Sequence, residues 1–141
     1  MVALSPRARE LLGSSALAHV VTINPDGSPQ VAVAWVGLDG DEIVIGHLNP
    51  TQQKVRNLRR DPRIALSVES DATNEYGLRE CLVIKGQTRF TDGGAAELLQ
   101  RLAHTYIGPD VRFPPMDDPP PGVVAHIAVE WVGGIGDWAE S

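Results

Sequence analysis

Cysteine is almost absent from this chain, and what the composition lacks excludes several classes of protein. The 141 residues include one cysteine, Cys81, so an intrachain disulfide and a cysteine cage for a metal are both excluded. The four histidines lack the spacing of metal ligands, and we expect no bound metal. No apolar run approaches the ~20 residues that a membrane span needs. The opening residues, MVALSPRARELLG, have no apolar signal-peptide centre, so we expect a cytoplasmic protein without a membrane partner.

Positive charge is also scarce, because 12 Lys and Arg residues stand against 18 Asp and Glu, a net charge of -6. This balance argues against nucleic acid as a partner, since such proteins present a basic surface. Five cations are nevertheless concentrated within ten residues, namely Lys54, Arg56, Arg59, Arg60 and Arg63. Such a cluster is either a local anion site or the solvated face of a helix.

Motifs for common enzyme chemistry are missing as well. The sequence has no nucleophile elbow, Walker loop, zinc signature or G-x-G-x-x-G fingerprint. We therefore assign no catalytic residue.

Hydrophobic residues make up 43% of the chain, enough for one globular domain over residues 1–141. Strand patterns occur at residues 16–23, 30–38, 42–48, 64–70, 79–91 and 123–132, and helix patterns at 5–12, 51–60 and 92–106. Strands and helices do not alternate as in parallel α/β folds. The predicted fold is mainly β (α+β), a six-stranded antiparallel barrel with short helices capping it.

The stretch from Glu42 to Val68 contains the best candidate site. Asn49 and Pro50 have the residue types of a helix N-cap and first helical position, and Asp61-Pro62 ends the helix. Lys54 lies one turn in. A helix N-terminus with nearby cations favours a phosphate group.

Two other features have local consequences. Gly86 interrupts the strand at 79–91 and predicts a bulge or bend. The proline-rich segment 107–122 is either a surface excursion or a wall over a ligand site.

Four pieces of the chain together resemble a known family: HVVTINPDGSPQVAVAWVGLDG, IVIGHL, KVRNLRRDPRIALSV and CLVIKGQTRF. They are similar to the split β-barrel flavin-binding proteins of the pyridoxamine phosphate oxidase type. The third piece is most similar to the branch that uses the deazaflavin coenzyme F-420. The resemblance implies a homodimer with a cofactor in each cleft at the subunit interface.

The same resemblance and the chemistry of a flavin-like ligand together indicate the site. Its phosphate needs cations, here Lys54 and Arg56, and its ring needs a flat apolar slot with backbone hydrogen bonds. The full predicted set is Val33, Ala34, Trp35, Gly46, His47, Thr51, Gln52, Gln53, Lys54, Arg56 and Asn57. Two members have structural alternatives: His47 as a packed histidine, and Trp35 as a core or interface residue.

The function that the resemblance implies is an F-420-dependent oxidoreductase that passes a hydride to a conjugated or unsaturated small organic substrate. The proton comes from solvent or from His47. Two alternatives stay open: an FMN-dependent oxidase or reductase of the same fold, and a non-catalytic protein that binds or carries a flavin, a deazaflavin or haem.

Overall fold

The computed structural model describes residues 2–139, which form three helices and seven strands. The helices are α1 (Pro6–Leu12), α2 (Gln53–Arg60) and α3 (Ala95–Tyr106). The strands are β1 (Ala18–Ile23), β2 (Pro29–Ala34), β3 (Gly37–Asp39), β4 (Glu42–His47), β5 (Arg63–Thr73), β6 (Arg79–Asp92) and β7 (Val123–Ile135).

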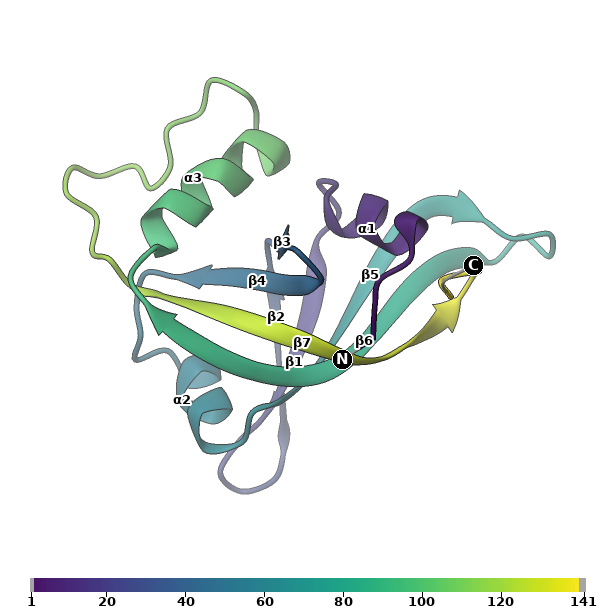
Figure 1. Ribbon diagram of the computed structural model, residues 1–141, viewed down its shortest axis with the longest axis horizontal. Helices are drawn as coiled ribbons and strands as arrows, with labels where there is room; N and C mark the ends of the chain where they lie inside the picture. Colours follow the sequence, from purple (N-terminus) through teal and green to yellow (C-terminus); the bar gives the residue numbers. More distant parts are fainter. Residues whose placement is uncertain (1, 140–141) are drawn as a thin grey trace.

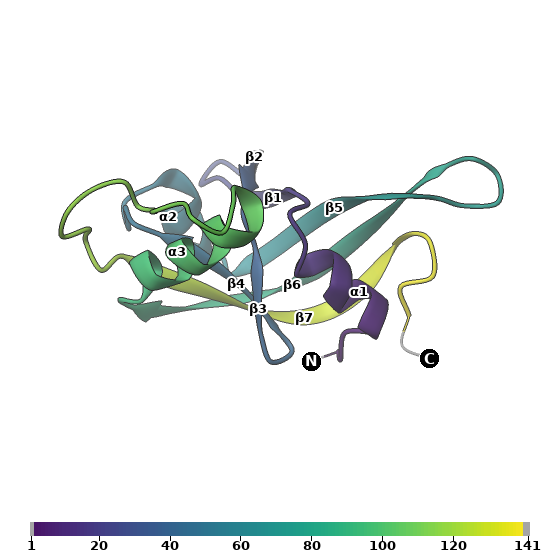
Figure 2. The same cartoon turned by 90° about the horizontal axis from the view of Figure 1, so that it is seen from above.

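All seven strands belong to one antiparallel sheet with the order β2-β1-β5-β6-β7-β4-β3. Strands β2 and β3 follow each other in the chain, yet they lie at opposite edges of the sheet. The sheet therefore curls until its edges approach, without closing into a hydrogen-bonded barrel. Figure 1 shows α3 and α2 on opposite sides of β4, and Figure 2 shows the curled sheet from above.

The strand predicted over residues 30–38 is two strands, and this is why the sheet has seven strands instead of six. Trp35 and Val36, which connect β2 to β3, belong to neither strand. The Tyr106 hydroxyl pairs with the backbone of this connection in place of a neighbouring strand. It accepts a hydrogen bond from the Val36 N–H at 3.0 Å. It can donate to the carbonyl of Ala16 or of Val36, each 3.1 Å away.

The strand β6 and its bulge are confirmed. The pairing register of β6 with β7 changes between Lys85 and Gly86. A Cβ atom on Gly86 would lie 2.3 Å from the Ala128 carbonyl oxygen, so the close approach of the two strands requires glycine. The fourth predicted strand was too short, because β5 continues to Thr73 before the turn that leads into β6.

Two predicted helix starts are wrong. Asn49 does not cap α2: its carboxamide oxygen accepts from the Thr51 N–H at 2.9 Å and so closes a separate turn. The helix begins at Gln53, with Gln52 as N-cap and no side chain capping it. Helix α3 begins at Ala95 instead of following Asp92, because Gly93 and Gly94 insert a left-handed turn. The start of α1 is confirmed, with the Ser5 hydroxyl accepting from the Ala8 N–H.

The main core fills the inside of the curled sheet. It contains Val20, Ile43, Leu66, Ile84 and Ile127, together with Leu12 from α1, which packs against the sheet. A second cluster lies between α3 and the sheet and joins Val44, Val124, Leu98 and Leu102. Among residues 2–139, no helix has the length and apolar composition to cross a membrane.

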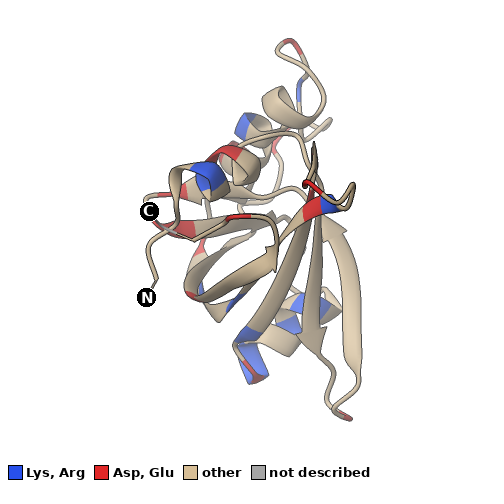
Figure 3. Cartoon of the chain, turned by 90° about the vertical axis from the view of Figure 1, so that its right-hand side faces the viewer, with Lys and Arg blue, Asp and Glu red and all other residues tan. Residues whose placement is uncertain are grey.

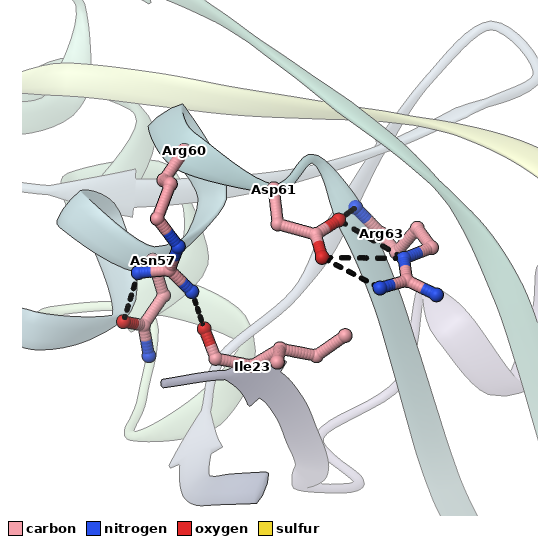
Figure 4. A network of polar contacts seen from close by, with 5 residues as sticks. All are labelled: Ile23, Asn57, Arg60, Asp61 and Arg63. Carbon is pink, nitrogen blue, oxygen red and sulfur yellow. Dashed lines mark hydrogen bonds and ion pairs between the residues drawn. The ribbon is translucent and has the colours of Figure 1, made fainter. Parts of the chain in front are cut away.

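A buried polar network attaches α2 to the β1–β2 hairpin. Asn57 is fully buried, and its amide nitrogen lies 3.1 Å from the Thr22 hydroxyl, 3.0 Å from Asn24 Oδ1 and 3.3 Å from Gln30 Oε1. Its oxygen accepts from the Gln53 amide at 2.8 Å. Figure 4 shows that Arg60 extends the network from Asn57 to the Ile23 carbonyl. These bonds set the position of α2 on the sheet.

We expect Asn57→Leu to lower the free energy of unfolding by about 2–4 kcal/mol, because it removes the shared partner of the buried Thr22 hydroxyl and of three half-buried side chains, Asn24, Gln30 and Gln53. Urea denaturation measures the loss. The matched control is Arg56→Leu on the same helix, because the Arg56 side chain is exposed and within residues 2–139 its one hydrogen bond goes to Gln53. We expect a change within about 0.5 kcal/mol for that variant. A similar small change for Asn57→Leu would contradict a structural role for the network.

Candidate functional site

A cavity of about 480 Å³ lies where the edges of the sheet approach, between α2 and the segment that contains α3. Its lining residues are Leu17, Val33, Ala34, Trp35, Ile45, Gly46, His47, Leu48, Asn49, Gln52, Lys54, Leu99 and Phe113. The two strands along its length each have an edge without a ladder partner in the described part of the chain. β2 pairs only with β1, and β4 beyond Val44 pairs only with β7.

The two ends of the cavity differ in chemistry. The end at α2 is polar and contains Asn49, Gln52 and Lys54. The other end is apolar and contains Leu99 of α3, with Trp35 and Phe113. Phe113 belongs to the proline-rich segment, so this part of the segment is a wall of the cavity.

Lys54 is the cation of the cavity. Its side chain is half-buried, and burial lowers its pKa. Within residues 2–139 no carboxylate forms an ion pair with it. Because no side chain caps α2, the N–H groups at the start of this helix also carry uncompensated positive charge. This end of the cavity can therefore bind an anion.

His47 is a buried histidine. It is 3% exposed, and among residues 2–139 neither ring nitrogen has a partner with hydrogen-bond geometry. Burial, and then the charge of Lys54, lower its pKa to about 4, while the nearby Gln52 side chain opposes this shift. At neutral pH the ring is therefore uncharged. Both ring nitrogens are themselves enclosed by the protein, so a ligand in the cavity could pair with them only after the lining shifts.

Gly46 permits the close approach of α3. A Cβ atom at this position would lie 3.1 Å from Leu99 Cγ and 3.3 Å from the Ala95 carbonyl oxygen. The missing side chain thus lets α3 pack directly on β4, and Leu99 reaches the cavity as a result.

Seven of the eleven predicted site residues line this one cavity: Val33, Ala34, Trp35, Gly46, His47, Gln52 and Lys54. Thr51, Gln53, Arg56 and Asn57 are not among its lining residues. Asn57 was expected to face the same cleft as Lys54, but its side chain points into the network with β1 and β2. Arg56 is exposed and donates to Gln53.

The other three cations of the basic cluster have protein partners. Arg59 lies over the Phe90 ring, with its guanidinium carbon 4.6 Å from the ring centroid. Arg60 donates to the Ile23 carbonyl, and Arg63 pairs with Asp61 (Figure 4). Four of the eight residues of α2 are Lys or Arg and are coloured blue in Figure 3. Only Lys54 among them lines the cavity.

The structure adds six lining residues that the sequence did not indicate: Leu17, Ile45, Leu48, Asn49, Leu99 and Phe113. Ile45 could have been predicted from the sequence, since it lies two residues before His47 and so points to the same side of the strand. Leu99 and Phe113 come from the α3 region, and only the tertiary structure brings them to the cavity. In the described residues, no group of three His, Cys, Asp or Glu side chains is placed to hold a metal ion.

The sequence model of the family described as pyridoxamine 5'-phosphate oxidase matches residues 4–136. The chain belongs to this family. The predicted split-barrel fold, α+β with short helices, is thereby confirmed, with seven strands in an open sheet. No match is found among curated proteins.

Solved structures share this fold. An F420 reductase is 26% identical, with a TM-score of 0.73, and the alignment covers 89% of this chain and 94% of that protein. A conserved hypothetical protein from Mycobacterium tuberculosis is 23% identical, with a TM-score of 0.70 over 92% of this chain and 82% of its own. A heme binding protein from Mycobacterium smegmatis is 17% identical, with a TM-score of 0.65 over 91% of this chain and 52% of its own. The latter two show likeness of fold alone.

The buried imidazole of this family member makes its stability depend on pH. Between pH 6.5 and about 4, the unfolded chain binds a proton on His47 and the folded chain does not. The free energy of unfolding therefore decreases as the pH is lowered through this window, by about 2–3 kcal/mol. Urea denaturation at a series of pH values measures the slope.

We expect His47→Gln to remove this part of the slope. His104→Gln, which removes an exposed imidazole, is the control and should keep the wild-type profile. Asp61, whose pKa is lowered to about 2 by Arg63, contributes its own loss of stability at lower pH. Parallel profiles for wild type and His47→Gln between pH 6.5 and about 4 would show that His47 does not titrate as described.

Proposed function

We propose that this protein binds coenzyme F-420 and transfers a hydride from its reduced form to a conjugated or unsaturated small organic acceptor. The observation that carries the proposal is the Lys54 ammonium, half-buried and without an ion-pair partner among residues 2–139, beside the uncapped start of α2. A phosphate group suits this combination. The likeness to an F420 reductase at 26% identity over 89% of the chain supports the choice of a deazaflavin.

The middle of the cavity suits the ring system of such a cofactor. Val33, Ala34 and Ile45 supply apolar surface there. The free edges of β2 and β4 supply main-chain donors and acceptors for the polar rim of a flat ring. When bound, reduced F-420 supplies the hydride, and the protein holds the acceptor beside it and limits access of water.

The proton that completes the reduction comes from solvent in this proposal. The acceptor gains two electrons and one proton with the hydride and then needs a second proton. His47 has a pKa of about 4 and is a neutral imidazole at pH 7, so it is a weak proton donor. His47 therefore serves as an uncharged part of the lining beside Lys54, and it can hydrogen-bond the cofactor only if the lining shifts to expose a ring nitrogen.

We further propose a homodimer with the cofactor at the subunit interface. Val31, Val21, Ala65, Lys85 and Trp131 form one row across five strands on the outer face of the sheet. Val31 is 62% exposed and Trp131 46%, an unusual exposure for large apolar side chains. Val33, in the same strand as Val31, is 53% exposed although it lines the cavity. A second subunit on this face would cover the open side of the cavity.

Two other ligands fit part of the same evidence. FMN also carries a phosphate and a flat ring, and would use the same groups. Haem would use the neutral, unpartnered imidazole of His47 as an axial ligand of its iron, and this requires the cavity lining to expose a ring nitrogen that is enclosed in the unbound protein. Titration of the purified protein with F-420, FMN and haemin side by side separates the three.

We expect Lys54→Ala to weaken F-420 binding by about 1.5–3 kcal/mol, through loss of a charge-assisted phosphate contact. Quenching of F-420 fluorescence measures the dissociation constant. Arg59→Ala is the matched control, because it removes the same charge from the same helix but its guanidinium lies over Phe90. If both variants weakened F-420 binding equally, Lys54 would contribute only through the general positive charge of the helix and not through a phosphate contact. Tighter binding of FMN or haemin than of F-420 would overturn the choice of cofactor.

We expect the wild-type protein to sediment as a dimer and Val31→Glu to sediment as a monomer with weakened F-420 binding, because a carboxylate at the apolar β2 end of this row would be buried in the subunit interface. Analytical ultracentrifugation measures the mass. Ile107→Glu is the control, since Ile107 is 55% exposed but follows α3 and belongs to none of the five strands that carry the row. A wild-type monomer that still binds F-420 would contradict the interface site.

A further inference from the structure

The apolar end of the cavity has an aromatic construction of its own. The Trp35 and Tyr106 rings are stacked, with centroids 5.4 Å apart and planes inclined by 12°. Phe113 approaches Trp35 at 5.1 Å with its plane inclined by 58°. Tyr106 therefore covers Trp35, while Trp35 and Phe113 form a corner: a flat ligand stacked on one ring meets the edge of the other.

Hydrogen bonds hold this corner in place. The Gln100 side chain of α3 donates to the Val111 carbonyl at 2.8 Å and accepts from the Phe113 N–H at 3.0 Å. These two bonds fix the proline-rich segment on both sides of Arg112. The Tyr106 hydroxyl fixes the other half of the corner through Val36. Phe113 is thus presented at a set position, although its segment has no regular structure.

The charge at this end also restricts the ligand. Leu17, Trp35, Leu99 and Phe113 carry no charge, and Lys54 and His47 lie with the α2 end. A charged ligand group would lose hydration here without gaining a partner. The corner therefore favours a flat, uncharged group that gains from stacking and from burial of apolar surface.

We infer that this aromatic corner is the acceptor subsite, and that Phe113 selects planar, conjugated, uncharged acceptors over small aliphatic ones. The inference rests on the proposed function, because it places the F-420 phosphate at the α2 end and the acceptor at the opposite end. Phe113 is a specificity-determining residue, and Gln100 is the residue that positions it.

Binding of menadione, a flat uncharged quinone, tests the subsite without any turnover. Equilibrium dialysis is run on the wild-type protein and its variants, with and without F-420, and with cyclohexenone as the small non-aromatic comparison. We expect Phe113→Ala to bind menadione roughly tenfold more weakly, through loss of the aromatic contact. Cyclohexenone and F-420 binding should each change by less than about twofold.

Two further variants sharpen the comparison. Phe113→Leu keeps apolar volume but removes the ring, and we expect it to lose most of the preference for menadione. Met116→Ala is the control, since Met116 lies in the same segment, is 44% exposed and does not line the cavity. We expect this control to bind menadione as the wild type does.

The outcomes separate the two proposals. Unchanged menadione binding by Phe113→Ala would overturn the subsite, as would an equal weakening of F-420, which would mean that the corner holds the cofactor ring. Absence of F-420 binding by the wild-type protein would overturn the proposed function. The menadione comparison on the protein without F-420 would still decide whether the aromatic corner binds flat acceptors.

Discussion

The central constraint in this structure is that the sheet cannot close. β2 and β3 are joined by only Trp35 and Val36, yet they pair with different neighbours at opposite edges. β3 is three residues long and reaches only as far as Val44, so the second half of β4 lacks a partner on one side. The cavity is a direct result, since Val33–Trp35 and Ile45–His47 line it from the two free edges.

The amino-acid sequence predicts most of the strands, but it does not predict the two free edges between which the cavity lies. Alternation and turn residues locate the strands, and the single glycine at position 86 locates the bulge in β6. The alternation of apolar and polar residues does not show which strands are neighbours, because a strand has the same alternation whether or not another strand pairs with its edge. The departure of Trp35 and Val36 from the ladder depends on Tyr106, seventy residues away in the chain.

The site was predictable in the same uneven way. Lys54, His47 and the end of β2 line one cavity, as the family resemblance led us to expect. Asn57 was placed wrongly, since a spacing of three residues from Lys54 brings two side chains near each other without making them face the same space. Its environment was decided by Thr22, Asn24 and Gln30, which no local pattern connects to it. Phe113 lies in an irregular segment, where periodicity carries no information.

The proline-rich segment has a consequence for how this fold can diversify. It is bracketed by α3 and β7, with backbone bonds from Gly93 to Gly122 and from Ala95 to Pro121, and none of its residues belongs to the sheet. Loop length changes the entropy of closing a surface connection only slowly. The segment can therefore gain or lose residues at little thermodynamic cost while the ladders stay intact. In evolutionary terms, the wall beside Trp35 is the part of the cavity that is freest to change, and the polar end at α2 is held in place by the buried network of Asn57.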